Sequence, residues 1–332
     1  MKRSIIFFLI ITLSISVLHS QVKQDHSYCN RDFDIAKELF FENQYSVSYD
    51  YFQRVLQTPQ LEADVKAEAE YYIAANSYYL KRSDALDVLE TYLEKYPYTP
   101  MRSKVYYMVG RLYYDKKNYS ETLKKYGQVR QKQLDKSDVE DYLFSMGYSQ
   151  LMLKQYPAAS KTFKSIKEYG HPYTKDAEYY YAYSEFCQKN YKPSLESFIN
   201  IDESSKYYEA AQFHSLQIYD QIGYRSEAVK LGKELLSKYP KSKYKTEAYR
   251  ILGENSYHQQ NWDDVIIYLS KYANNEEKIQ RSDMYMLGIA YYMKQKYSNA
   301  IGSLGRVTTE QDSLSQNAYI FIGHSYLKLN QP

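Results

Sequence analysis

Apolar residues recur along this chain with the spacing of helices. Residues 284–292 are apolar on nearly every turn, and the polar stretch 294–296 then interrupts the pattern. A second series at the spacing i, i+1, i+4, i+7 follows, formed by Ala300, Ile301, Leu304 and Val307. One face of a helix gives this spacing. The segment therefore predicts two helices, one over 284–292 and one starting near Ser298, joined by a short turn.

The same two-helix pattern repeats along the chain. A small or modest residue, here called the anchor, recurs inside tyrosine-rich segments at intervals of 34 to 39 residues. An aromatic residue follows most anchors by nine positions, a small or β-branched residue by twelve, and a large apolar residue by sixteen. The anchors are Ala36, Ala75, Gly110, Gly147, Ala182, Leu216, Gly253, Gly288 and Gly323. Self-similarity at this period is typical of a solenoid of stacked helix pairs.

Helix packing explains why the anchors are small. Two antiparallel helices joined by a short turn approach closely only where a side chain is absent or tiny. We therefore expect Gly288 to face Ala300 across its helix pair. The aromatic at the turn is expected to fill the wedge between the two helices.

Repeat eight, with Leu287-Gly288, Tyr291-Tyr292 and Ala300, resembles the tetratricopeptide repeat family. Repeats three, four, seven and eight match the family pattern well, and repeats one, five and nine match it moderately. Repeat two is about two residues short in its turn near Arg82, and repeat six has Leu216 at its anchor. The resemblance covers residues 32–332. It implies an all-α, tetratricopeptide-type helix-turn-helix solenoid, a right-handed superhelix of about eight and a half repeats.

The solenoid is expected to end mid-repeat. Repeat nine supplies a first helix around Gly323, and the sequence given stops at Pro332, where its second helix should begin. A solenoid needs a polar helix to close its apolar end. We therefore expect the chain to be part of a longer array.

Two of the second helices end in a Tyr-Pro pair, at Tyr96-Pro97 and Tyr239-Pro240, where the proline stops the helix. In this detail the chain resembles the exported bacterial branch of the family, which includes outer-membrane assembly and envelope-maintenance proteins.

The first twenty residues are identified as a secretory signal peptide. Lys2 and Arg3 precede an apolar run over residues 5–18, and Ser20 offers a small residue before Gln21. A membrane anchor is the alternative, although the run is short for a span. We expect residues 21–31 to lead into the solenoid. The protein is then exported to the periplasm or outer-membrane periphery of a bacterium, keeps no stable membrane span, and associates with the envelope through partners.

Composition and charge narrow the classes of partner. The chain has 43 Tyr but only 12 Phe and 1 Trp, which suits partly buried helix faces or a surface that grips a partner. Removal of the signal peptide leaves 41 Lys+Arg against 40 Asp+Glu, so no nucleic-acid partner is expected. Cys29 lacks the small and aliphatic residues of a lipidation box before it. Cys29 and Cys187 lie four repeats apart, so both are expected to be free thiols.

No motif for catalysis, cofactor binding or metal binding emerges. The six histidines are scattered, and no two stand at the helical spacing of metal ligands. A phosphate-binding glycine loop, a nucleophile elbow and a Cys-His signature are also missing. Asn118-Tyr119-Ser120 matches a glycosylation sequon, but Tyr119 is the turn aromatic of repeat three, so the match is interpreted as coincidental. We therefore predict no catalytic residue, no cofactor and no enzyme activity.

The resemblance also implies a binding face. In this family the first helices line a concave groove, and positions three before, one after and four after the anchor tend to face it. In this sequence the predicted groove residues are Tyr72, Asn76, Tyr79, Tyr107, Arg111, Tyr114, Tyr179, Tyr183, Phe186, Tyr257, Tyr285 and Tyr292. The alternative is that these tyrosines pack against the next repeat. The Lys-and-Asn pattern by which some members clamp a terminal carboxylate is matched only by Asn76, so that clamp is not expected.

The function predicted from these features is a non-catalytic scaffold of the bacterial envelope that binds a protein or an extended peptide. Two alternatives stay open. The chain could be the docking module of an enzyme whose catalytic domain lies beyond Pro332, or it could bind glycan or peptidoglycan, because stacked tyrosines also suit sugar faces.

Overall fold

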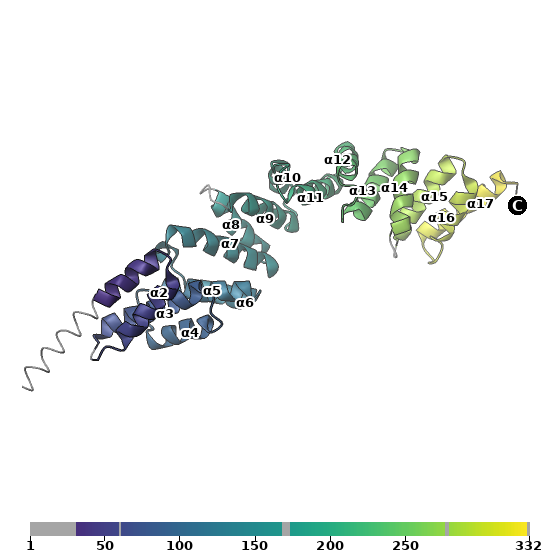
Figure 1. Ribbon diagram of the computed structural model, residues 1–332. Coiled ribbons are helices and arrows are strands. Elements are labelled where there is room, and N and C mark those ends of the chain that lie inside the picture. The colour runs from purple at the N-terminus through teal and green to yellow at the C-terminus, as the bar shows by residue number, and fades with distance from the viewer. Residues whose placement is uncertain (1–30, 60, 168–172, 276–278, 331–332) are drawn as a thin grey trace, which may run out of the picture. The chain divides into compact units, whose positions relative to one another are not determined.

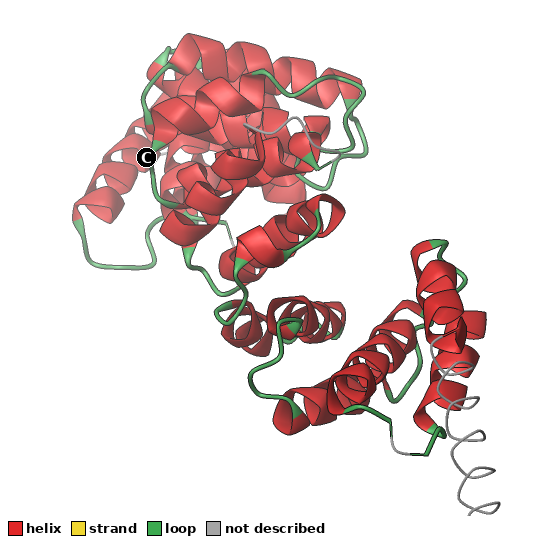
Figure 2. Ribbon diagram, turned by 90° about the vertical axis from the view of Figure 1, so that its left-hand side faces the viewer, coloured by secondary structure: helices red, strands yellow, loops and turns green. Residues whose placement is uncertain are grey.

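The computed structural model describes residues 31–59, 61–167, 173–275 and 279–330. The predicted signal peptide and residues 21–30 of the lead segment lie outside these residues. Within them, every element of regular secondary structure is a helix (Figure 2). The chain divides into two compact units, Met1–Gln155 (unit 1) and Tyr156–Pro332 (unit 2).

Unit 1 contains the helices of repeats one to three and the first helix of repeat four (Figure 1). Residues 31–41 are helical. They are followed by α2 (Tyr45–Leu56), α3 (Ala63–Tyr79), α4 (Ala85–Lys95), α5 (Arg102–Asp115), α6 (Tyr119–Tyr126), the short 3-10 helix η1 (Gln131–Gln133) and α7 (Lys136–Met152).

Unit 2 contains the remaining helices, from teal to yellow in Figure 1. They are α8 (Tyr156–Lys167), α9 (Thr174–Cys187), α10 (Tyr191–Ile199), α11 (Tyr208–Gln221), α12 (Arg225–Lys238), α13 (Lys245–His258), α14 (Trp262–Asn275), α15 (Arg281–Met293), α16 (Tyr297–Gly305) and α17 (Ser313–Lys328). In chain order the described helices form eight pairs plus one first helix. The predicted fold class, a helix-turn-helix solenoid, is confirmed.

The turn inside each repeat has one conformation. In repeat three Lys117 is left-handed, with φ 58°. The N–H groups of Lys117 and Asn118 donate to the carbonyls of Tyr114 and Tyr113 at 2.8 and 2.9 Å, which is a Schellman ending. The left-handed residue follows its anchor by seven positions in every repeat except the second, at Asn43, Lys117, Lys154, Lys189, Gly223, Gln260, Gln295 and Asn330. A turn of shared geometry therefore follows the first helix of each repeat.

The glycine anchors face the large residue sixteen positions later. A Cβ built on Gly288 would lie 2.6 Å from Leu304 Cγ and 3.3 Å from the Leu304 backbone nitrogen. Gly253 stands in the same relation to Leu269. Leu304 therefore supplies the atoms nearest to this Cβ position, and the expected approach of Ala300 to Gly288 stays a prediction.

The residue twelve positions after the anchor reaches the anchor's backbone instead. Ser48 Oγ donates to the Ala36 carbonyl at 2.8 Å, and Ser194 Oγ donates to the Ala182 carbonyl at 2.8 Å. A small side chain at this position lets the second helix approach the first, and the side chain sixteen positions after the anchor then fills the space that the anchor leaves.

Both Tyr-Pro pairs end their helices as expected. Helix α4 stops at Lys95 and α12 stops at Lys238, and the following residues, Tyr96 and Tyr239, have nearly identical backbone angles (φ −124°, ψ 66° and φ −125°, ψ 68°). Proline disfavours the helical region for the residue before it, which explains the shared break.

First helices form a continuous layer in each unit. In unit 1, α3 contacts α5 and α5 contacts α7; in unit 2, α9, α11, α13, α15 and α17 each contact the next. Within the described parts of each unit, second helices make no comparable contacts with one another. Because consecutive first helices lie closer together than second helices, each stack curves toward its first helices. The side of the first helices that faces away from the second helices is therefore the concave side of each unit, here called its inner face.

Helix α17 presents an open side. Ile320 is 53% exposed and Leu327 is 65% exposed. A Cβ on Gly323 would meet nothing within 4 Å, whereas the equivalent Gly288 is tightly covered. Phe321 is partly buried and packs edge-on against Tyr292 at 5.1 Å.

Candidate partner-binding face on the first helices

The register of repeat two differs by one residue from the expected one. The left-handed Lys81 follows Ala74, not Ala75, by seven positions. Val105, five positions before the anchor of repeat three, is fully buried, and its counterpart five before Ala74 is the fully buried Ala69. Ala74 is therefore the anchor of repeat two.

Two predicted groove residues of repeat two lie in the interior. Tyr72 is 5% exposed and stacks on Phe52, with ring centroids 4.9 Å apart and planes at 4°. Asn76 is fully buried, and its Nδ2 donates to Ser48 Oγ at 3.0 Å. Both side chains pack against the second helix of repeat one. Their assignment to an open groove is corrected.

Tyr79 is only partly buried and belongs to a stacked pair. Its ring lies 4.5 Å from that of Tyr45, with the planes at 9°. Its neighbour Tyr78 stands four positions after Ala74 and so occupies the place predicted for Tyr79. Burial, followed by the charge of Asp141, raises the pKa of Tyr78.

Tyr107 and Arg111 meet at one carboxylate. The Tyr107 hydroxyl donates to Asp141 Oδ2 at 3.0 Å, and Arg111 Nη1 donates to Asp141 Oδ1 at 2.5 Å. Arg111 Nε also lies 3.3 Å from Asp115 Oδ1. Tyr107 is 4% exposed and packs between repeats three and four, so its assignment to an open groove is also corrected. The Arg111 side chain is 24% exposed and reaches the surface.

Asp138, one turn before Asp141, carries a carboxylate without a hydrogen-bond or ion-pair partner among the residues the structure describes. Burial, reinforced by the charge of Asp135, raises its pKa to about 6. The charge of Lys104 lowers the pKa of Asp138, but the Lys104 ammonium forms its ion pair with Asp135, at 2.8 Å. A half-buried anion of this kind gains stability from any cation that reaches it.

The charge of this carboxylate acts on several tyrosines. The charge of Asp138 contributes to the raised pKa of four hydroxyls that come from α2, α3 and α5, those of Tyr45, Tyr78, Tyr79 and Tyr107. The inner face of unit 1 thus combines an unpaired carboxylate with aromatic side chains. We define this face by its partly exposed residues Tyr79, Arg111, Tyr114, Asp138 and Tyr148.

Tyr114 lies on this face and also closes the turn of its repeat. Its ring is 6.1 Å from Tyr119 and 6.0 Å from Tyr148, in edge-to-face contacts, and the Arg111 guanidinium lies 4.9 Å from its centroid. The predicted aromatic wedge at the turn is confirmed by this arrangement. It recurs in Phe186–Tyr191, Tyr257–Trp262 and Tyr292–Tyr297, with centroids 6.4, 5.7 and 5.7 Å apart.

In unit 2, three predicted groove residues surround a histidine. The rings of Tyr179, Tyr183 and Phe186 lie 6.5, 5.2 and 5.2 Å from the His214 ring. Tyr179 also stacks on Tyr207 at 4.3 Å and 8°. His214 stands two positions before Leu216, where Tyr72 and Phe321 stand in their repeats. The cluster therefore joins repeats five and six by packing.

The surroundings of His214 predict a pH dependence of unit 2. Burial lowers the pKa of His214; Gln217 raises it and the charge of Lys243 lowers it further. Between the folded pKa and the unfolded value of ~6.5, the unfolded chain binds a proton that the folded chain does not. His214 therefore makes unit 2 less stable as the pH falls below ~6.5.

Fluorescence of Trp262, the single tryptophan, reports urea unfolding of unit 2. We expect the midpoint to fall less between pH 7.5 and 5.0 in His214→Phe than in the wild type. The exposed His258, changed to Phe, is the control. The buried Asp283, whose pKa is raised to about 6, acts in the opposite direction in all three proteins and cancels. Identical pH dependence of wild type and His214→Phe would contradict the prediction.

The inner face of repeats seven and eight is dominated by one arginine. Arg250 donates to Glu247 Oε1 and Glu254 Oε2, both at 2.8 Å. Asp283 is 2% exposed and its Oδ2 has no hydrogen-bond partner among the described residues. Tyr285 is partly buried, and burial raises its pKa. Arg250 is paired with two acids of its own helix, so its charge is offset within this face.

The described residues offer few other groups that could bind a metal ion or react chemically. They contain no group of three or more His, Cys, Asp or Glu side chains placed to hold a metal ion. Cys187 is a free thiol whose pKa is raised by burial. The Asn118 side chain accepts from the Glu121 N–H at 3.3 Å and so caps α6. Across the described ranges, no helix combines the length and the apolar character that a membrane span needs.

Sequence reasoning missed Asp138 and Asp141 because it followed aromatic positions. Asp141 stands six positions before Gly147 and pairs with Arg111, one position after the preceding anchor. Lys37 and Glu68 repeat this relation at 2.9 Å when Ala74 is the anchor. A search for opposite charges at these two positions would have found both pairs. No sequence signal marks Asp138 as unpaired.

Among known proteins, the chain is similar only to solved structures. No family model matches the chain, and no curated protein matches it. A tetratricopeptide repeat protein from Parabacteroides merdae ATCC 43184 is 12% identical with a TM-score of 0.43; the match covers 78% of this chain and 98% of that one. The apo form of RapI is 14% identical with a TM-score of 0.46, covering 92% and 99%.

A thermophilic TPR protein from Thermus thermophilus is 14% identical with a TM-score of 0.34, covering 57% of this chain and 99% of that one. At such identities the likeness concerns the fold alone. The assignment of the solenoid rests on this chain's own anchors, Schellman turns and first-helix layers.

Proposed function

We propose that this protein is a non-catalytic scaffold of the bacterial cell envelope that binds a protein or extended peptide along the inner face of unit 1. The observation that carries the proposal is Asp138, a carboxylate without a described partner among tyrosines of the first helices. A scaffold face of this composition suits a partner that brings a basic side chain.

The chemistry of the face favours a cationic peptide over a neutral sugar. Aromatic rings attract a nearby cation through their negatively charged faces, and a desolvated carboxylate strengthens that attraction. Tyr79, whose pKa the Asp138 charge raises, supplies a ring near the carboxylate. Tyr114 and Tyr148 contact each other further along the face, and Tyr148 stands ~15 Å from Asp138 along the axis of α7. Aromatic residues with an adjacent arginine, here Arg111, are also the types enriched at binding hot spots.

The proposed location rests on the N-terminal sequence. Lys2 and Arg3 before the apolar run support cleavage near Gln21 and export. Mass spectrometry of the native N-terminus tests this step. A chain that begins at or near Gln21 outside the cytoplasm supports the envelope role, and an intact Met1 in the soluble cytoplasmic fraction contradicts it.

Site-specific photocrosslinking in the cell tests the binding face. The photoreactive residue p-benzoylphenylalanine replaces Tyr114 on the inner face. In a matched variant it replaces Tyr113, whose hydroxyl points to Glu90 of α4 at 3.4 Å. We expect position 114 to capture a discrete protein that position 113 does not. Equal capture at both positions, or capture of cell-wall glycan alone at position 114, would contradict the proposal.

A further inference from the structure

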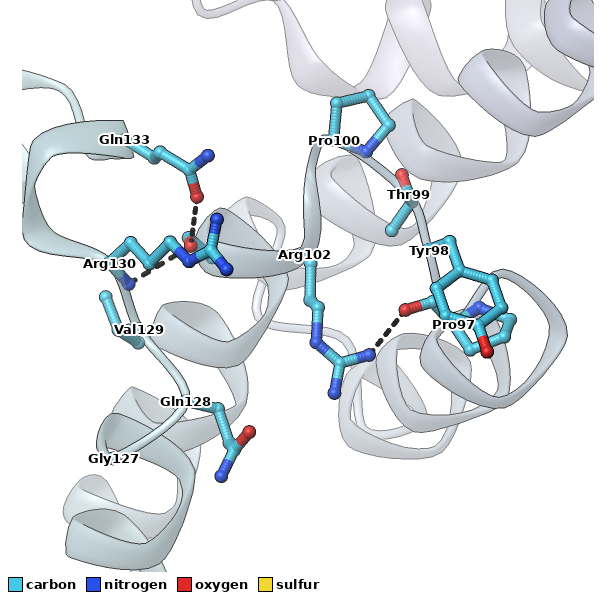
Figure 3. Close-up of a pocket in the computed structure, with 11 residues that line it drawn as sticks. Pro97, Tyr98, Thr99, Pro100, Arg102, Gly127, Gln128, Val129, Arg130 and Gln133 are labelled. Atoms are coloured by element: carbon cyan, nitrogen blue, oxygen red, sulfur yellow. Dashed lines mark hydrogen bonds between the residues drawn. The ribbon is translucent and has the colours of Figure 1, made fainter.

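A cavity of about 810 Å³ opens in unit 1 between two connections that join second helices to the next first helices. Residues 97–100 with Arg102 and Ser103 form one wall, and residues 127–130 with Gln133 form the other (Figure 3). The lining includes Arg102 and Arg130 but no aspartate or glutamate. The cavity therefore carries two positive charges that no lining carboxylate offsets.

Both arginines keep donors for a ligand. Arg102 Nη1 donates to the Pro97 carbonyl at 2.6 Å, and its Nη2 donates to the Tyr106 hydroxyl at 3.1 Å. A guanidinium has five N–H donors, so these bonds orient Arg102 without exhausting it. The guanidinium of Arg130 makes no hydrogen bond or ion pair with another described residue. Figure 3 shows the Arg102 side chain between the two walls.

The walls are held in place by hydrogen bonds. Ser103 Oγ donates to Gln133 Oε1 at 2.6 Å and accepts from the Arg130 N–H at 3.1 Å. On the other side, the Met101 N–H donates to Thr99 Oγ1 at 3.2 Å. Walls fixed in this way lose little conformational freedom when a ligand enters, which favours binding.

We propose that this cavity binds an oxyanion, a carboxylate or phosphate group on a small ligand, between Arg102 and Arg130. The planar guanidinium fork matches the oxygens of both groups and forms paired, charge-assisted hydrogen bonds with them. The volume lies within the range of small-molecule sites. Tyr98 is 96% exposed and offers its ring to the rest of the ligand. This site is separate from the inner face of the proposed function, because it lies on inter-repeat connections.

Isothermal titration of the full chain at low ionic strength tests the proposal, with inorganic phosphate and citrate as probes. We expect at least one probe to bind saturably. Tighter binding of phosphate identifies a phosphoryl ligand, and tighter binding of citrate identifies a carboxylate ligand. Arg102→Gln and Arg130→Gln should each weaken binding about tenfold.

The control is the double variant Lys132→Gln/Lys136→Gln, which removes two nearby exposed charges outside the lining. It should change the affinity less than about twofold. Circular-dichroism melting confirms that each variant is folded, and a crystal soaked with the tighter probe should show it between the two arginines. Equal weakening by the control variant, or no saturable binding of either probe, would overturn the proposal.

Discussion

Replacing Gly288 by alanine should destabilise unit 2 by about 1–3 kcal/mol, because the added methyl group has no space. Its Cβ would lie 2.6 Å from Leu304 Cγ and 3.3 Å from the Leu304 backbone nitrogen. Leu304 is fully buried, so it can move only by shifting α16 against α15. Urea unfolding followed by Trp262 fluorescence measures the change.

Gly302→Ala is the matched control in the neighbouring helix. A Cβ at Gly302 meets nothing within 4 Å. Alanine is favoured over glycine inside a helix by about 1 kcal/mol, so this change should leave unit 2 equally or more stable. If both variants have the same stability, the close approach of the two helices does not explain why the anchor is a glycine.

The second large effect is expected at Tyr107. Tyr107→Ala should destabilise unit 1 by about 3–5 kcal/mol, the usual loss when a buried aromatic side chain is truncated. Tyr107→Phe keeps the ring and removes only the hydroxyl bond to Asp141, with an expected loss of about 1 kcal/mol. Hydrogen exchange of peptides from α5 and α7, read by mass spectrometry, measures both changes.

Tyr114→Ala separates packing from binding. Tyr114 is partly exposed on the same helix, so its truncation should raise exchange in α5 and α7 less than Tyr107→Ala does. Equal effects of the two truncations would mean that Tyr114 is also core. Tyr107 would then contribute no more to the stability of unit 1 than Tyr114 does, although Tyr107 is the more deeply buried of the two.

The sequence was sufficient to predict the solenoid because its packing rules are local. The packing of one helix pair requires a small anchor, an aromatic nine positions later and a large apolar residue sixteen positions later. The same requirement recurs in each repeat. The Schellman turns could not be predicted in the same way. Lysine or glutamine occupies six of the nine described left-handed positions, and only Gly223, Asn43 and Asn330 are residue types that favour this conformation.

The binding face was predicted less well, for two physical reasons. The shortened turn of repeat two hid a one-residue shift, and one residue on a helix rotates a side chain by roughly 100°. That rotation accounts for the burial of Asn76, whereas the position three before the anchor is buried even without a shift, as Tyr107 shows. In addition, the positions of residues along the sequence do not show which side chains form hydrogen bonds or ion pairs with one another. Tyr107 pairs with Asp141, while Asp138, one turn away, has no such partner.

The central claim is that Asp138 contributes charge to partner binding. Isothermal titration of the protein captured at position 114 tests it most directly, with Asp138→Asn and, as control, Asp87→Asn on the exposed side of α4. At pH 7.5 we expect Asp138→Asn to weaken binding at least about tenfold and Asp87→Asn less than about twofold. The pKa of Asp138 is raised to about 6, so protonation should weaken wild-type binding as the pH falls to 5.5. Asp138→Asn should then bind with little dependence on pH. Equal affinity of wild type and Asp138→Asn at pH 7.5, with the same pH dependence, would contradict the account.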